Sequence, residues 1–422
     1  MKVSINRLTK SFLLLMFAAG NSLLKPFGDG LFFWSTNDGV KKMCFLLSVL
    51  CFLLCLWKFR RSNKFLNLSI GIIIVAAIIA VFRSEDVFTT ALLSSLNYYY
   101  VLAAIPIYSL LVNKRWPLKN LLRSITIIAF LSYFLKGGIT IIEYITGNVV
   151  FPTIALESVG RLSYRNHFLR INPPAFGIII IPIAMYLYYT ETIKRKKLFS
   201  LGVAFISIIY SGLIHQARSM LVYQLLEFIF LILLRYKGRP RNVVIFSIVA
   251  TGFVFFVNSS IGNEFIDSFS PEGLYGNSTT SRLYAYSYFG SKWLNSSLFL
   301  GTGFLQGNNY TLMGEFTIQA SLWDIGFLTT IVQMGLLALS SYILFIVYGF
   351  KAGKRIEKYD KSLKLLAYGI VVSMILTAIN IDWFIDIFAV SVPIGFAVIA
   401  YIGYLCGSEN QLEDDNLIKE VL

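Results

Sequence analysis

Stretches of about 20 mostly apolar residues recur along the whole chain, each followed by a short polar segment. As an α-helix, a stretch of that length spans the roughly 30 Å hydrocarbon core of a bilayer. The chain is 56% hydrophobic and 14% charged, whereas a soluble domain has about 25% charged residues. The sequence therefore excludes a soluble protein and predicts an all-α, polytopic integral membrane protein.

The pattern predicts about 12 transmembrane helices. Their approximate spans are residues 9–34, 43–58, 65–82, 87–112, 121–146, 172–190, 198–214, 219–235, 242–258, 325–350, 365–381 and 387–406. The first span is expected to be kinked or broken near Pro26. We expect it to be retained, because Leu23, Leu24 and Lys25 follow its apolar core, where a signal peptide would have small residues.

Basic residues concentrate in every second connection, and this asymmetry predicts the orientation. Together with the chain ends, these connections hold 26 of the 37 Lys and Arg residues. They lie at 58–64, 114–123, 194–197, 235–241 and 351–364. Because cytoplasmic loops accumulate Lys and Arg, this side and both termini are predicted to be cytoplasmic. The net charge of +15 then divides into +17 inside and −2 outside, so it does not indicate a nucleic-acid partner.

Two outer connections are long, near 148–171 and 259–323, and long connections are disproportionately functional. Shorter ones, such as 83–86 and 381–386, are expected only to turn the chain. The larger loop is predicted to be an ordered subdomain with a helix near 281–293. The predicted units are residues 1–258 with nine transmembrane helices, the outer loop 259–324, and residues 325–422 with three helices and a short cytoplasmic tail.

Five arginines fall on the predicted outer side, where the positive-inside rule disfavours them: Arg161, Arg165, Arg170, Arg218 and Arg282. A guanidinium group offers a planar fork of donors that matches a pair of phosphate oxygens, and it stays charged at any working pH. An outer cavity lined by these arginines would suit a diphosphate group. The alternative for each one is a membrane-surface anchor or an ion pair with a nearby carboxylate such as Glu157.

Three segments resemble the O-antigen polymerase and ligase superfamily. They are His215-Gln-Ala-Arg-Ser219 before an apolar helix; Ser281-Arg282, Trp293-Leu-Asn295 and Leu298-Phe-Leu-Gly301-Thr-Gly303 in the large loop; and Asp324-Ile-Gly326 with Gly335 opening the next helix. The Arg-bearing loop before Pro173-Pro174 is also similar. The large loop lacks the histidine of ligase-type members, which favours the polymerases.

The resemblance implies a GT-C-like polymerase/ligase fold with a large late extracytoplasmic loop. It implies a Wzy-type enzyme that joins oligosaccharide repeat units into O-antigen or capsular polysaccharide at the outer face of the bacterial cytoplasmic membrane. The donor and acceptor would be undecaprenyl-diphosphate-linked glycans. Membrane lipid and a chain-length regulator protein are the other expected partners.

Such a transfer needs a base to take the proton of the acceptor hydroxyl. Glu315 and Asp324 are the candidate catalytic residues, and the five arginines are the candidate diphosphate ligands. The alternative for Asp324 is a helix cap ahead of Ile325. The sequence has no pattern typical of a metal site, and we predict no metal and no cofactor.

A lipid-linked oligosaccharide flippase or another transporter is the strongest alternative function. Transport would place ionisable groups along a central path, and Lys136, Glu143 and Glu227 lie within predicted helices. Lys136 and Glu143 could equally pair with each other. The large late loop favours the polymerase, because flippases have short outer loops.

Overall fold

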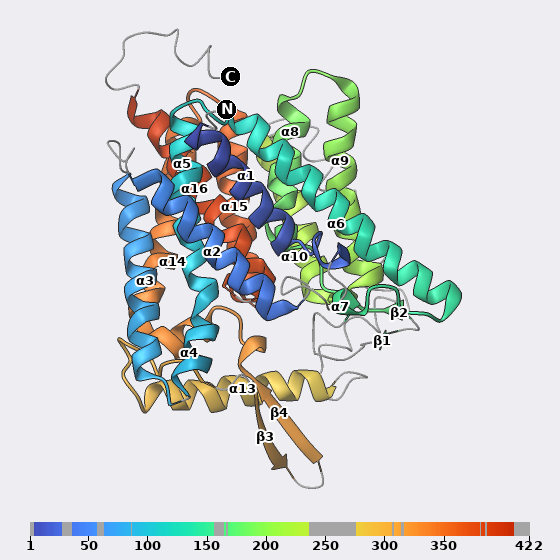
Figure 1. Cartoon of the computed structure of the whole chain (residues 1–422), viewed down its shortest axis with the longest axis vertical. Helices are drawn as coiled ribbons and strands as arrows, with labels where there is room; N and C mark the ends of the chain where they lie inside the picture. The colour runs from blue at the N-terminus through green and yellow to red at the C-terminus, as the bar shows by residue number, and fades with distance from the viewer. Residues whose placement is uncertain are drawn as a thin grey trace.

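The computed structural model in Figure 1 describes residues 4–27, 36–56, 63–85, 87–155, 164–165, 168–235, 276–305, 308–313, 316–379, 381–384 and 386–408. The first half comprises α1 (Ile5–Gly20), η1 (Lys25–Phe27), α2 (Asn37–Leu56), α3 (Lys64–Arg83), α4 (Phe88–Ser95), η3 (Leu96–Ala103), α5 (Ala104–Val112), α6 (Leu118–Thr146), α7 (Pro152–Ala155), β1 (Tyr164–Arg165), β2 (Phe168–Leu169), η4 (Ala175–Ile178), α8 (Ile180–Thr190), α9 (Lys194–Ile209), the π-helix η5 (Tyr210–Ile214) and α10 (Arg218–Arg235). The second half comprises α13 (Gly276–Leu294), β3 (Asn308–Met313), β4 (Phe316–Ser321), η6 (Leu322–Asp324), α14 (Leu328–Ile356), α15 (Lys361–Ala378), η7 (Asp386–Ser391) and α16 (Val392–Ser408).

The described chain is an all-α bundle of the kind expected of a polytopic membrane protein. Eight of its helical segments are long and apolar enough to cross a membrane. They correspond to eight of the predicted spans. The strands form two small antiparallel hairpins, β1–β2 and β3–β4, at one end of the bundle (Figure 1).

The other four predicted spans differ. The span 242–258 lies outside the described residues. Helix α8 has 11 residues, α10 has 18 residues with three charged side chains, and α1 has 16 residues. The predicted break near Pro26 comes earlier, at Gly20, because the buried Asn21 side chain donates to the Phe17 carbonyl and ends α1 there.

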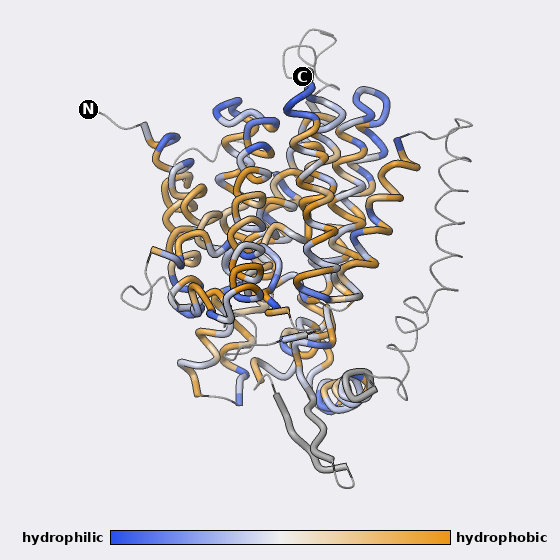
Figure 2. Tube along the Cα trace, turned by 90° about the vertical axis from the view of Figure 1, so that its right-hand side faces the viewer, coloured by the Kyte–Doolittle hydropathy of each residue, from blue (hydrophilic) through white to orange (hydrophobic). Residues whose placement is uncertain are grey.

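The bundle has an apolar band between two polar ends (Figure 2). Helix α1 begins and α16 ends at the same end of the bundle, whereas α13 lies across the opposite end (Figure 1). This arrangement agrees with an even number of crossings and with a predicted outer face that carries the late loop. The helix predicted near 281–293 is confirmed as α13.

The centre of the bundle contains an irregular segment, η4. Pro173 and Pro174 precede it, and Pro182 has no amide hydrogen to give to the Ile178 carbonyl, so a continuous α-helix cannot form. Inside a membrane, the exposed backbone groups need other partners. Side chains from four other elements supply them: Asn21 accepts from the Phe176 amide, Gln224 donates to Gly177, Ser373 donates to Ile178 and Ser391 donates to Ala175.

Helix α14 is also interrupted, at Gly335, whose φ of 70° and ψ of −167° are not helical. The interruption leaves backbone carbonyls and amides without their helical partners. Segment 298–303 of the late loop binds two carbonyls and two amides: the Thr302 and Gly303 amides donate to the Val332 and Gln333 carbonyls at 2.8 and 3.0 Å, while the Leu336 and Leu337 amides donate to the Leu298 and Phe299 carbonyls at 3.0 and 3.1 Å. The expectation that Gly335 opens the helix is therefore wrong. Gly335 lies inside α14 and joins its two halves.

We predict that Gly335→Ala destabilises the protein by about 1–3 kcal/mol or more, because only glycine readily adopts this backbone conformation. The added Cβ would also collide with the Phe299 carbonyl. The midpoint of thermal unfolding in detergent measures the loss. The control is Gly71→Ala in α3, where a Cβ meets no atom within 4 Å. Equal midpoints for the two variants would contradict the proposed role of Gly335.

Candidate functional site

The late outer loop is held by the short turn after α3. Arg83 Nε donates to the Gly301 carbonyl at 3.3 Å, and Ser84 Oγ donates to the Phe304 carbonyl at 2.6 Å. The expectation that residues 83–86 only turn the chain is therefore wrong. The turn connects the late loop to helices that precede it by more than two hundred residues.

The connection after α15 carries a fully buried acid, so the same expectation for residues 381–386 is also wrong. Asp382 accepts hydrogen bonds from the Thr330 amide at 3.1 Å, the Tyr342 hydroxyl at 3.0 Å and the Phe384 amide at 2.8 Å, and from the Thr330 hydroxyl. The Thr330 amide belongs to the first turn of α14, whose amides have no partner within the helix. Asp382 therefore caps α14 from another segment.

Tyr98 of η3 extends this cluster towards the break. Its hydroxyl donates to Gln333 Oε1 at 3.1 Å and lies 3.3 Å from Thr330 Oγ1. All three side chains are buried. The first part of α14 is thus fixed by the late loop at its broken end and by Asp382 and Tyr98 along its side.

Helix α13 brings an arginine and a tyrosine to the start of α14. Arg282 and Tyr286 are four residues apart, and residues at this spacing share one face of a helix. Asp324, at the end of η6, interacts electrostatically with both. A small apolar cluster beneath α13 holds these elements together and consists of Ala285, Phe289, Leu305, Leu322, Ile325 and Val332.

Burial raises the pKa of Asp324, and the neighbouring Arg282 guanidinium opposes this rise by favouring the ionised carboxylate. Burial also raises the pKa of Tyr286. A carboxylate with a raised pKa accepts a proton more readily than a solvated one, and the arginine offsets part of the rise. The arrangement can therefore supply a base next to a fixed positive charge.

A second arginine is fixed near the start of α10. Arg170 follows the β1–β2 hairpin, and its Nε donates to the His215 carbonyl at 3.0 Å. His215 follows η5, three residues before Arg218 begins α10. Further along α10, Tyr223 interacts electrostatically with Arg282. Arg170 and Arg282 thus both lie beside the first turns of α10, where the helix dipole also favours anions.

Two predicted site residues, Arg161 and Glu315, lie outside the described residues. The structure describes the backbone of two others, with Arg165 in β1 and Arg218 as the first residue of α10. The first loop, the start of α10 and the late loop are therefore the segments that carry the predicted arginines.

The alternative in which Asp324 caps the following helix is wrong. Helix α14 begins at Leu328, and the preceding residue, Phe327, makes no side-chain cap hydrogen bond. The Thr329 amide instead bonds to the Gly326 carbonyl at 2.9 Å. Asp324 instead interacts electrostatically with Arg282 of α13.

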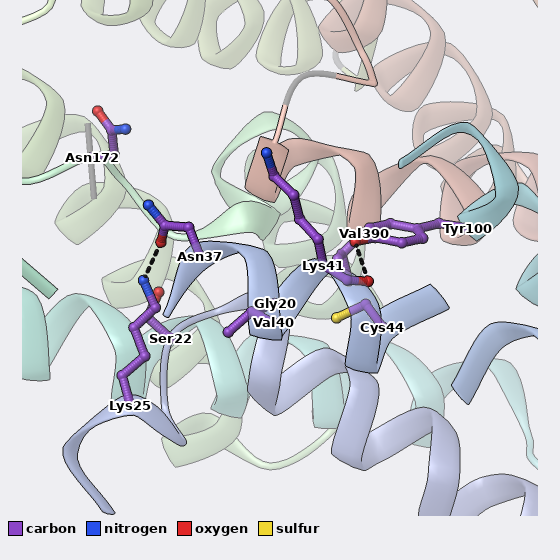
Figure 3. A pocket seen from close by; sticks show the side chains of 10 residues that line it. All are labelled: Gly20, Ser22, Lys25, Asn37, Val40, Lys41, Cys44, Tyr100, Asn172 and Val390. Atoms are coloured by element: carbon purple, nitrogen blue, oxygen red, sulfur yellow. Dashed lines mark hydrogen bonds between the residues drawn. The ribbon is translucent and has the colours of Figure 1, made fainter. Parts of the chain in front are cut away.

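A small cavity of about 30 Å³ lies between the outer ends of α1 and α2 (Figure 3). Its described lining includes the cationic side chains of Lys25 and Lys41 and the amide of Asn172. Lys25 Nζ donates to Asn37 Oδ1 at 2.7 Å. Asn172 follows Arg170 by two residues, so this polar cavity adjoins the end of the Arg-bearing loop.

No protein-family model matches the sequence, and no curated protein is significantly similar to it.

Sequence reasoning missed Asp382 and the two lysines of the cavity. Asp382 lies between two apolar helices, in a short connection that was expected only to turn the chain. An acid so close to membrane-spanning segments is itself a signal, because ionisable groups there are rare and usually have partners. Lys25 and Lys41 also lie on the predicted outer side, where basic residues are disfavoured. The same signal that singled out the arginines could therefore have found them.

We predict that Asp382→Ala strongly destabilises the protein, because it leaves several buried donors without an acceptor at a cost of about 1–3 kcal/mol each. Asp382→Asn retains an acceptor oxygen and should cost less. The matched control is Asp360→Ala, which removes the side-chain cap of α15 and should cost about 1 kcal/mol. Chemical unfolding in micelles gives the comparison, and an Asp382→Ala protein as stable as the control would contradict the capping role.

Proposed function

We propose that the protein is a membrane glycosyltransferase that polymerises polyprenyl-diphosphate-linked oligosaccharide repeat units at the outer face of the bacterial cytoplasmic membrane. The observation that carries the proposal is the grouping of Arg170, the start of α10 at Arg218, and the Arg282–Asp324 pair at one end of the bundle. This grouping combines positive charge with a partly buried carboxylate on the face predicted to be external.

The positive charges suit the leaving group. When the glycosidic bond to a diphosphate breaks, the bonding electrons leave with the diphosphate, whose negative charge then grows. Fixed guanidinium groups and a helix N-terminus stabilise such a developing charge without rearranging. Arg282 and Arg170 are the described side chains assigned to this role, and Arg161, Arg165 and Arg218 are proposed with them.

The carboxylate suits the acceptor. As an acceptor hydroxyl attacks the anomeric carbon, its proton must pass to a base. Asp324 is the proposed base, because burial raises its pKa while Arg282 opposes the rise and favours the ionised form. Glu315 remains the second proposed catalytic residue. The chemistry as proposed uses these side chains, with no metal or cofactor.

We predict that Arg282→Ala or Asp324→Asn slows polymerisation too much to restore long chains in a deletion strain that wild-type protein restores. Loss of one group that stabilises the developing charge costs about 100-fold or more in rate, so long surface polysaccharide should disappear. Gel electrophoresis of surface polysaccharide measures chain length. The matched control is Lys292→Ala on the same helix, since its exposed pair with Glu85, at 3.3 Å, should contribute little.

The fate of single repeat units separates the candidate functions. A polymerase defect leaves single units at the outer surface. Units trapped on the cytoplasmic side of the deletion strain would contradict the proposal and favour a flippase. Normal polymer that is not attached to its final acceptor would also contradict it and favour a ligase.

We also predict a shift in the pH dependence of the reaction. Arg282 lowers the pKa of Asp324, so Arg282→Gln should raise that pKa. The residual activity should then fall at a higher pH on the acidic side, because Asp324 must be ionised to accept a proton. Arg282→Lys retains the charge and should shift the profile less. The assay uses purified protein and lipid-linked single units extracted from the deletion strain; identical acidic limbs for wild type and Arg282→Gln would contradict the assignment of the base.

A further inference from the structure

An acidic side chain lies inside the bundle, away from the proposed site. Glu227 is in the middle of α10 and is 3% exposed. On the same helix Arg235 is eight residues away, a rise of about 12 Å. An ionised carboxylate in such an apolar place would be costly without a close partner.

Most charged groups of the surrounding elements lie at the ends of the helices, and Lys136 of α6 is the exception. Lys136 is fully buried, and its Nζ donates to the Asn172 carbonyl at 3.1 Å. Arg218 begins α10, nine residues before Glu227. The other basic residues of α9, α10 and α15 lie in the parts of these helices predicted to be cytoplasmic, and they are Lys194, Arg195, Lys196, Lys197, Arg235, Lys361 and Lys364. Glu191, at the end of α8, is bound by Arg123 in a two-point ion pair with distances of 2.5 and 2.7 Å. The tyrosines Tyr133 and Tyr210 approach from α6 and η5, and Tyr133 lies 2.7 Å from Ser207 Oγ.

The contacts of Ser373 favour a neutral Glu227. Ser373 Oγ lies within hydrogen-bond distance of two acceptors, the Ile178 carbonyl in η4 and, at 3.2 Å, Glu227 Oε2. A serine hydroxyl has one hydrogen, which cannot serve both acceptors at once. If that hydrogen goes to Ile178, Oε2 must itself carry a hydrogen and donate it to Ser373. The protonated acid thereby satisfies both contacts.

Three buried oxygens around Glu227 have no hydrogen-bond partner among the described residues: Glu227 Oε1, Gln224 Oε1 and Ser211 Oγ. Each unsatisfied buried group costs about 1–3 kcal/mol. Buried water commonly fills such sites and needs two to four polar partners, as a rough rule. Gln224 and Glu227 share one face of α10, and Gln224 Nε2 donates to Ser207 Oγ at 2.9 Å. Ser211 follows Ser207 by one turn. Polar side chains therefore follow one another from Glu227 through Gln224 and Ser207 to the turn that carries Ser211, and we call this row the polar track.

The track runs towards the outer face. Ser211 lies in the π-helix η5, a type of element that is rare and often found at functional sites. The end of η5 is held by Arg170 through the His215 carbonyl. The outer end of the polar track therefore lies next to the first outer loop, which carries Arg170.

We infer that Glu227 is held as a neutral acid in a buried, hydrated pocket between α9, η5, α10 and α15, and that water in this pocket exchanges its proton with the outer face. The ligands of the site are water molecules and one proton. The inference rests on hydrogen bonding and burial and does not depend on the proposed glycosyltransferase activity.

Infrared spectroscopy of the purified protein in lipid nanodiscs at neutral pH tests the inference. The wild-type minus Glu227→Gln difference spectrum should contain a protonated-carboxyl C=O band, and this band should move to lower frequency within minutes in D2O. The matched control is Glu191→Gln, which should remove only ionised-carboxylate bands, because its pair with Arg123 lowers the pKa of Glu191.

Two results would overturn the inference. Loss of ionised-carboxylate bands in Glu227→Gln would show a charged Glu227, and a C=O band that stays fixed in D2O for an hour would show a dry pocket. If Glu227→Gln does not fold, Gln224→Leu retains the acid but blocks the track. The Gln224→Leu protein should keep the C=O band, and the band should shift more slowly in D2O. A shift as fast as in the wild type would contradict proton exchange along the polar track.

Discussion

The fold depends on satisfying backbone hydrogen bonds where helices are interrupted inside an apolar environment. An unsatisfied amide or carbonyl in a membrane costs several kcal/mol, roughly, so an interruption persists only where other groups replace the helical bonds. At η4, side chains from α1, α10, α15 and η7 supply these groups. At Gly335, the backbone of segment 298–303 supplies them. Both interruptions bring distant parts of the sequence together.

These interruptions also determine where the candidate site forms. Segment 298–303 connects the break in α14 to α13, and α13 carries Arg282 to Asp324. The η4 segment follows the first outer loop, so its position fixes Arg170 near the start of α10. Two arginines from loops more than one hundred residues apart thus lie beside one helix. The positions of these two arginines therefore depend on the backbone hydrogen bonds formed inside the bundle.

Apolar runs predicted the membrane class and most spans, because they repeat locally along the chain. The sequence also predicted the helix that carries Arg282, since Tyr286 and Phe289 follow at helical spacing. It did not predict the end of α1 at Gly20, which requires Asn21 to bond with the Phe17 carbonyl. Nor did it predict the capping of α14 by Asp382, because that contact joins residues 52 positions apart. Partners of this kind are set by packing and leave no local pattern.

The insertion of segment 298–303 into α14 has a consequence for synthesis of the protein. The segment is synthesised before α14, and Arg83 and Ser84, which hold the same loop, are made more than two hundred residues earlier. The hydrogen bonds that join the two halves of α14 can therefore form only after the loop and both halves have been made. Completion of this helix is a late step in the assembly of the protein.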